Sequence, residues 1–125
     1  KIAVFSNDPN VDPKGACVGS RGSRVRQIVN ELKGEKLDVV EWREDKVRFI
    51  IEALGPADIE LVDIDEHTKS AKVTVKDNQL SLAIGKEGQN ARLAAKLTGY
   101  KIDIEGLGDS PVIEEVQEES KQEEE

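Results

Sequence analysis

The chain has 125 residues, of which 35% are charged, 37% are hydrophobic and 3% are aromatic, which allows one ordinary domain or two small ones with thin aliphatic cores. A net charge of −8 argues at first against a nucleic-acid-binding protein, because such proteins usually present a basic face. No run approaches the roughly 18 apolar residues of a membrane span and no signal-peptide pattern is present, so we expect a soluble protein without a membrane partner.

The first half of the chain predicts a strand, two helices and a second strand. Residues 2–5 indicate a short buried strand that ends in a turn-rich segment. Asp12 and Pro13 are typical of a helix start, which predicts a short helix over about 13–18. Apolar residues at i, i+3, i+4 and i+7 then predict an amphipathic helix that ends at Gly34, and the alternation of Leu37 and Val39 predicts a strand; the helix positions are Val25, Ile28, Val29 and Leu32.

The second half predicts a helix, a hairpin, two more helices and a last strand. The helix follows from the same apolar spacing at Val47, Ile50, Ile51 and Leu54, and Gly55-Pro56 ends it. Alternating patterns then predict strands over 59–64 and 71–75 and a last strand at Ile102 and Ile104. Between them we expect helices over 79–84 and 89–98, the second of which stops at Gly99.

The two halves repeat one pattern. At an offset of 66 residues, two glycines and an arginine coincide: Gly19 with Gly85, Gly22 with Gly88, and Arg26 with Arg92. After one lost position the offset is 65, and it pairs Gly34 with Gly99 and Asp38 with Asp103. We interpret this as an internal repeat. It divides the chain into a first module (1–42), a second module (43–106) and a tail (107–125).

Each module places a G-x-x-G loop between two helices. Glycines at both ends allow a close approach to another chain and permit positive φ. The following helix presents free N–H groups and the positive end of its dipole, so an anion is the expected ligand. Residues 14–26 carry four basic side chains and no acid, and residues 86–101 carry four basic side chains against Glu87. Two local basic patches therefore coincide with the two loops.

Most of the net negative charge lies at the C-terminal end of the chain. Residues 109–125 hold eight acids and one lysine, a net charge of −7, so residues 1–108 are nearly neutral. Such a composition predicts a disordered, solubilising tail; competition with the anionic ligand of the basic loops is the alternative. The overall charge is thus no evidence against two small anion-binding sites.

A single G-x-x-G is a weak signal that an ordinary helix turn also produces, but its duplication in one frame strengthens it. Neither copy extends to a Walker loop or to the dinucleotide-binding fingerprint. A helix, a G-x-x-G loop and a second helix on a small sheet is the KH arrangement, in which the loop clamps the backbone of about four nucleotides.

Residues 7–24 and 79–94 closely resemble the tandem KH region of the NusA family of bacterial transcription factors, and the resemblance extends over residues 1 to about 106. It implies an α+β fold of two prokaryotic-type (type II) KH domains of order α-β-β-α-α-β, joined as one rigid body. The first domain would lack its opening helix and first strand. It also implies a cytoplasmic protein that binds nascent single-stranded RNA and acts with RNA polymerase and other transcription factors in elongation, termination and antitermination.

We expect the RNA contacts at the two loops and the helix starts behind them. For Arg92 and its counterpart Arg26, a phosphate contact and a place on the flank of the helix are evenly balanced. Glu87 disfavours phosphate binding. The predicted RNA-binding residues are Gly19, Ser20, Arg21, Gly22, Ser23, Arg24, Gly85, Lys86, Glu87, Gly88, Gln89, Asn90 and Arg92.

Other residues favour structural roles. We expect Trp42 to anchor the junction of the modules and Cys17 to be a small packing residue. The predicted hairpin turn places His67 in solvent. Residues that could line a base-binding groove are expected to be mostly core: Val18, Ile28, Ile84 and Ala94.

Catalysis has little support in this sequence. One cysteine and one histidine cannot form a disulfide or a Cys/His zinc site, and a single cysteine is consistent with the cytosol. We therefore expect no enzyme activity, metal, cofactor or small-molecule substrate. Two alternatives remain open: a KH-fold platform that docks polymerase or regulatory proteins, and another bacterial KH protein of the ribosome or of ribosome assembly.

Overall fold

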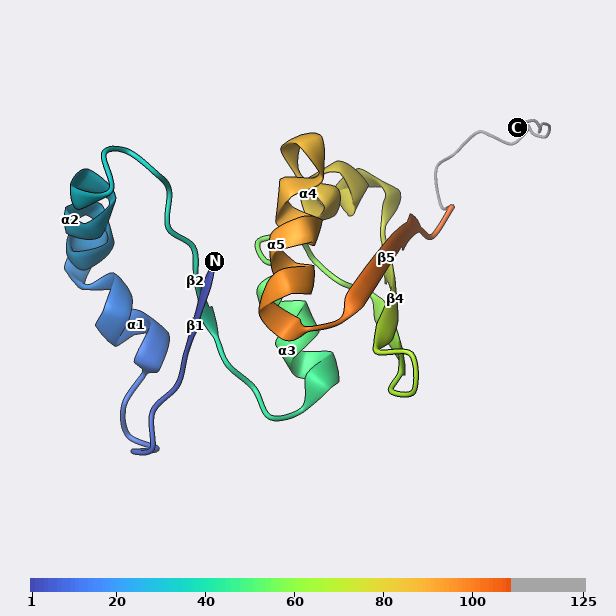
Figure 1. The fold of residues 1–125 in the computed structure, drawn as a ribbon, viewed down its shortest axis with the longest axis horizontal. Coiled ribbons are helices and arrows are strands. Elements are labelled where there is room, and N and C mark those ends of the chain that lie inside the picture. Colours follow the sequence, from blue (N-terminus) through green and yellow to red (C-terminus); the bar gives the residue numbers. More distant parts are fainter. Residues whose placement is uncertain (109–125) are drawn as a thin grey trace.

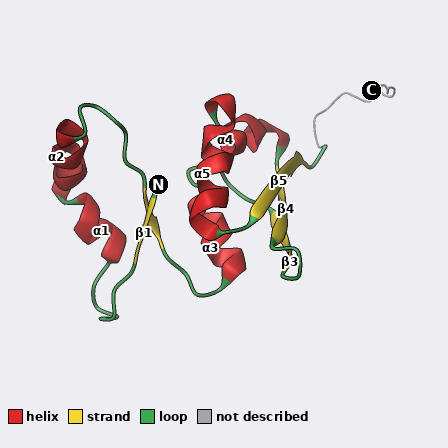
Figure 2. Cartoon of the chain, viewed as in Figure 1, coloured by secondary structure: helices red, strands yellow, loops and turns green. Residues whose placement is uncertain are grey.

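The computed structural model describes residues 1–108, and they form an α+β chain of helices and strands (Figures 1 and 2). The first module contains β1 (Ile2–Val4), α1 (Pro13–Val18), α2 (Ser23–Glu31) and β2 (Val39–Glu41). The second contains α3 (Lys46–Ala53), β3 (Leu61–Asp65), β4 (Ser70–Val75), α4 (Leu80–Ile84), α5 (Gln89–Thr98) and β5 (Lys101–Gly106). Short 3-10 turns precede α2, α4 and α5: η1 (Ser20–Gly22), η2 (Asp77–Gln79) and η3 (Lys86–Gly88).

Helix starts agree with the sequence signals, but one helix end does not. Asp12 caps α1, because its Oδ1 accepts a hydrogen bond from the Gly15 N–H at 3.1 Å. α2 ends at Glu31, and the predicted left-handed stop at Gly34 is wrong by one residue. The left-handed turn begins at Lys33, with φ of 61°, and Gly34 N–H closes the helix by donating to Val29 O at 2.9 Å.

The second module is a three-stranded sheet covered on one face by its three helices (Figure 1). β3 and β4 pair antiparallel, which confirms the predicted hairpin, and β4 and β5 pair parallel, with Ala71 opposite Ile102. Parallel neighbours need a crossover connection, which α4 and α5 supply. The loop between these two helices therefore lies at the end of a rigid β-α-α-β unit.

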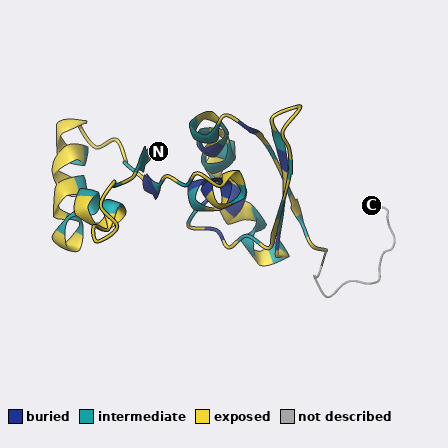
Figure 3. Cartoon of the chain, turned by 90° about the horizontal axis from the view of Figure 1, so that it is seen from below, coloured by how far each residue is buried: buried dark blue, intermediate teal, exposed yellow. Residues whose placement is uncertain are grey.

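The first module repeats this unit with a smaller sheet. β1 and β2 pair parallel, with Ile2 opposite Val39, and α1 and α2 form the crossover. No residue of α1 or α2 is buried, so both helices are largely exposed in Figure 3. Phe5 is 62% exposed, and Val39 and Val40 are the buried residues of this module. The first module therefore leaves apolar side chains such as Phe5 exposed to solvent.

The hydrophobic core lies in the second module. Its largest fully buried side chains are Ile50, Leu54, Val73 and Val75, from α3 and β4. The predicted stripe of α3 is wrong at one position. Ile51 is 39% exposed, whereas Phe49 is buried, because the helix also faces the junction with the first module, where the Phe49 ring meets Trp42.

Aromatic and aliphatic contacts join the modules. The Trp42 ring packs edge-on to Phe49, with centroids 6.5 Å apart, and its centroid is 5.4 Å from that of Phe5. The backbone N–H of Trp42 donates to Val4 O at 2.8 Å, and Val40 of β2 belongs to the core cluster of the second module. The prediction that Trp42 anchors the junction is confirmed.

Candidate nucleic-acid interface

The two G-x-x-G loops adopt the same backbone conformation. Gly19 and Gly85 have φ of 81° and 83°, with ψ of 170° and 167°. The third residues, Arg21 and Glu87, have φ of 54° and 56°, and the second glycines have φ of 75° and 76°. This match supports the internal repeat, because two unrelated turns would have no reason to share these four dihedral angles.

The first glycine of each loop is needed for packing within the protein itself. A Cβ on Gly85 would lie 2.6 Å from the Asn90 backbone nitrogen, and a Cβ on Gly19 would lie 2.9 Å from the Arg24 nitrogen. Glycine here therefore allows the second helix to pack closely on the loop. This packing role adds to the close approach to another chain and the positive φ expected from the sequence.

Both helices behind the loops begin without a side-chain cap. α2 starts at Ser23 after Gly22, and α5 starts at Gln89 after Gly88, with no capping hydrogen bond from either glycine. Early N–H groups of such helices and the positive end of the dipole favour an anion. The two α-helices of 9 and 10 residues thus direct the same electrostatic feature to the two loops.

Several predicted contact residues project into solvent at these loops. Ser20, Arg21 and Ser23 are exposed at the first loop, and Lys86, Glu87 and Gln89 are exposed at the second. Cations and hydroxyl groups at the first loop suit a phosphate ligand. Glu87 leaves the second loop with a mixed charge.

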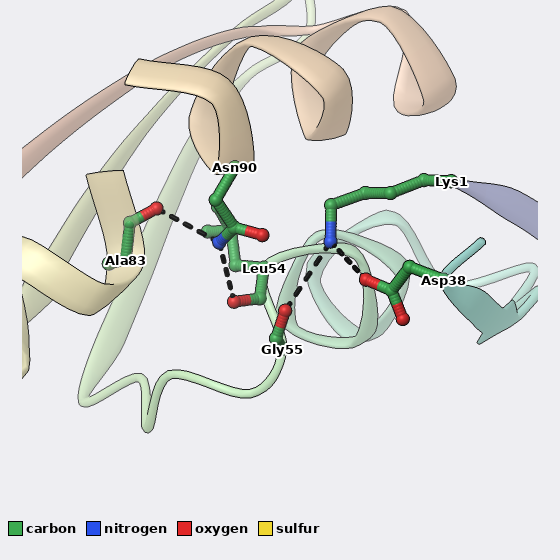
Figure 4. Close-up of polar contacts among 6 residues, drawn as sticks. All are labelled: Lys1, Asp38, Leu54, Gly55, Ala83 and Asn90. Atoms are coloured by element: carbon green, nitrogen blue, oxygen red, sulfur yellow. Dashed lines mark hydrogen bonds and ion pairs between the residues drawn. The ribbon is translucent and has the colours of Figure 1, made fainter. Parts of the chain in front are cut away.

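Other predicted contact residues hold the loops together. Asn90 Nδ2 donates to Leu54 O and to Ala83 O, both at 3.0 Å, and so joins the ends of α3 and α4 to the start of α5 (Figure 4). At the equivalent position, Arg24 Nη1 donates to Ala16 O at 2.6 Å. Arg92 Nη1 donates to Glu87 O at 3.1 Å. Sequence reasoning missed these internal roles, although the repeat aligns Arg24 with Asn90.

A groove of about 790 Å³ separates the second loop from the first module. Its walls include Gly85, Lys86 and Gln89 on one side and residues 35–38 on the other. Lys1 crosses the junction beside it: Lys1 Nζ binds Asp38 Oδ2 at 2.5 Å and Gly55 O at 3.3 Å (Figure 4). Sequence reasoning missed this contact, since nothing local to Lys1 indicates a partner 54 residues away.

The expected core role of the groove candidates holds only in part. Ala94 is fully buried, as expected. Ile28 and Ile84 are 42% and 36% exposed, so the core prediction is wrong for both. Ile28 lies on α2, which has no third strand to cover it among the described residues. Ile84 ends α4 next to the glycine loop.

Within residues 1–108 no cluster of three His, Cys, Asp or Glu side chains could hold a metal ion. His67 is exposed in the turn between β3 and β4, as predicted, and Cys17 is a free, half-buried thiol. None of the helices in this range has the length and apolar character to cross a membrane. Residues 109–125, which carry most of the predicted acidic tail, lie outside the described residues.

A helix, a G-x-x-G loop and a second helix on a small sheet, present twice, define a tandem KH protein. Comparison with family models agrees: the NusA-like first KH domain matches residues 1–42 and the NusA-like second KH domain matches residues 46–111. The chain belongs to the NusA-like KH domain family.

Three relatives support this assignment. The chain is 62% identical over 104 residues to the transcription termination/antitermination protein NusA of Halalkalibacterium halodurans, which covers 83% of this chain and 27% of the relative. It is 58% identical over 110 residues to that of Bacillus subtilis, covering 88% and 30%. It is 54% identical over 112 residues to that of Mycobacterium bovis, covering 89% and 32%. The chain thus spans about a third or less of these relatives.

The fold also resembles a solved structure described as the crystal structure of APE1850. The TM-score is 0.59 at 26% sequence identity, and the match covers 73% of this chain and 70% of that chain. The matched part of this chain is longer than either module alone.

Proposed function

We propose that the chain binds single-stranded RNA through both G-x-x-G loops, as the nucleic-acid-binding part of a transcription elongation, termination and antitermination factor. The main support is the recurrence of one loop conformation at two basic patches, each with an uncapped helix behind it. In this function each loop holds phosphates with backbone N–H groups and nearby cations. Exposed Ile28 and Ile84 are candidates for apolar contact with bases.

The groove at the junction gives the RNA a path between the modules. A strand held at Lys86 would meet the residue 35–38 segment of the first module on the other wall of the groove. Two modules at about four nucleotides each would then occupy roughly eight nucleotides. Few aromatic residues are available, so base recognition would depend on aliphatic contacts and hydrogen bonds rather than on stacking.

The protein context follows from the relatives, which are named as transcription termination/antitermination proteins. We propose that the chain acts on nascent RNA with RNA polymerase and other transcription factors through a longer polypeptide. It would be located in the bacterial cytoplasm, and its role would be binding rather than catalysis. We place the boundary of the two domains between residues 42 and 43, directly after the Trp42 anchor.

Acidic substitutions at either loop should weaken RNA binding about tenfold or more, which corresponds to about 1.4 kcal/mol. Lys86→Asp tests the second loop, and Ser20→Asp with Arg21→Asp tests the first. All three side chains are exposed, so the thermal midpoint should hardly change. Fluorescence anisotropy with short single-stranded RNAs would measure the dissociation constants, and a circular dichroism melt would check the fold.

Lys46→Asp is the matched control for these variants. Lys46 is also exposed, but it lies at the start of α3, away from the second loop. The opposite end of α3 is the one near that loop, where Leu54 O accepts a hydrogen bond from Asn90. Salt titration adds a second measure: if about six phosphates are neutralised, log affinity should fall with log salt with a slope near −4. RNA affinity that is equal in wild type, the loop variants and Lys46→Asp would reject the loops as the binding site.

A protein-docking platform is the second candidate, and Glu87 favours it at the second loop. This acidic side chain is exposed at the position where Arg21 stands in the first loop. If the Ser20/Arg21 variant abolishes RNA binding and Lys86→Asp has no effect, the second module would be assigned to a protein partner.

A further inference from the structure

One hydrogen bond recurs at equivalent positions of the two modules. Arg26 Nη1 donates to the carbonyl oxygen of Arg21, and Arg92 Nη1 donates to that of Glu87 at 3.1 Å. Each acceptor is the third residue of its G-x-x-G loop, and each donor lies on the helix that follows. The bond thus joins the same two positions in both modules, although the two middle residues of the loops differ.

The guanidinium reaches this carbonyl by passing over the second glycine. A Cβ on Gly22 would lie 3.3 Å from Arg26 Nη1, and a Cβ on Gly88 would lie 3.7 Å from Arg92 Nη1. The second glycine therefore supplies positive φ in both loops, and a Cβ would crowd the arginine at Gly22 but make only an ordinary contact at Gly88. This gives the fourth loop position a role within the protein as well as toward a ligand.

The residue that accepts the bond is one that needs support. Arg21 and Glu87 are not glycines, yet their φ values of 54° and 56° lie in the left-handed region, which other residues rarely adopt. Such a conformation persists only where surrounding contacts hold it. A donor on the carbonyl of this residue supplies such a contact and also covers a partial negative charge close to the expected phosphate.

We propose that Arg26 and Arg92 are positioning residues, each of which locks its glycine loop in the RNA-binding conformation by holding the carbonyl of the third loop residue. This inference rests on the proposed RNA binding and adds to it. Under this proposal Arg92 supports the loop from within the protein and does not contact phosphate itself. Two independent copies in one chain, with the same donor atom and the same acceptor position, carry the inference.

Arg92→Ala should loosen the second loop in the free protein. The Gly88 N–H donates to Gly85 O at 3.0 Å, so its hydrogen exchange reports whether the loop is closed. We expect its exchange to become about tenfold faster, with amides in the middle of α5 unchanged. Lys96→Ala, which removes an exposed cation one turn further along α5, is the control and should leave Gly88 unaffected.

RNA titration separates positioning from direct contact. Arg92→Ala should weaken RNA binding about three- to tenfold with an unchanged salt slope, whereas loss of a phosphate contact would reduce the slope by about one. Arg92→Lys keeps the charge, but its ammonium ends one bond short of the Nη1 that reaches Glu87 O, so it should not restore either the affinity or the slow exchange.

Three results would overturn the proposal. These are unchanged Gly88 exchange in Arg92→Ala, a salt slope reduced by one unit, and full recovery of affinity in Arg92→Lys. Failure of RNA binding in the wild-type protein would instead reject the proposed function, while the exchange measurement would still test the hydrogen bond.

Discussion

Residues 1–42 alone should show no cooperative thermal unfolding, whereas residues 43–108 should unfold in one cooperative transition. The first module has two buried residues, Val39 and Val40, and neither of its helices buries a side chain. Val40 also packs into the core of the second module, so separation removes half of this small set. A chain of about 40 residues without a disulfide or metal rarely folds alone.

Circular dichroism melts and hydrogen exchange would measure this difference. The second module keeps the buried side chains of α3 and β4, so its fragment should retain a sigmoidal transition. Its midpoint should fall below that of the whole chain, because loss of Val40 leaves part of the core unpacked. A cooperative melt of residues 1–42 would contradict the view that the first module depends on its neighbour.

Gly85→Ala should destabilise the second module by about 3 kcal/mol, the combined effect of strain and collision. Gly85 has φ of 83° and ψ of 167°, a region that is essentially limited to glycine. A Cβ there would also lie 2.6 Å from the Asn90 backbone nitrogen, and backbone cannot rotate out of the way as a side chain can. At about 4–8 °C per kcal/mol for a domain of this size, the melting midpoint should fall by more than about 12 °C.

Gly99→Ala is the control for this substitution. Its φ of 78° is nearly the same, but nothing lies within 4 Å of the position of a Cβ. Only left-handed strain remains, so the expected loss is about 1 kcal/mol. Chemical denaturation of the two variants would measure both values. Equal losses would show that the contact with Asn90 has no energetic weight.

Local sequence patterns predicted most of the elements, because the signals are local. Asp12 caps α1, alternation identifies the β3–β4 hairpin, and Gly99 ends α5. Two signals were off: Lys33 takes the left-handed position one residue before Gly34, and β2 begins at Val39, after Leu37. The repeat located both loops correctly, since glycines with positive φ are needed at the same points of each copy.

Sequence by itself therefore determined the tandem KH organisation, the two loops and the family. Tertiary structure decided which side chains near the loops and the junction bind groups of the protein itself. Asn90 binds carbonyls of α3 and α4, Arg92 binds its own loop, and Lys1 joins the modules through Gly55. Periodicity reports which face of an element is apolar, but a hydrogen-bond partner 36 or 54 residues away depends on how the elements pack. The same reason explains Ile28 and Ile84, whose apolar character indicated the core and whose neighbours leave them exposed.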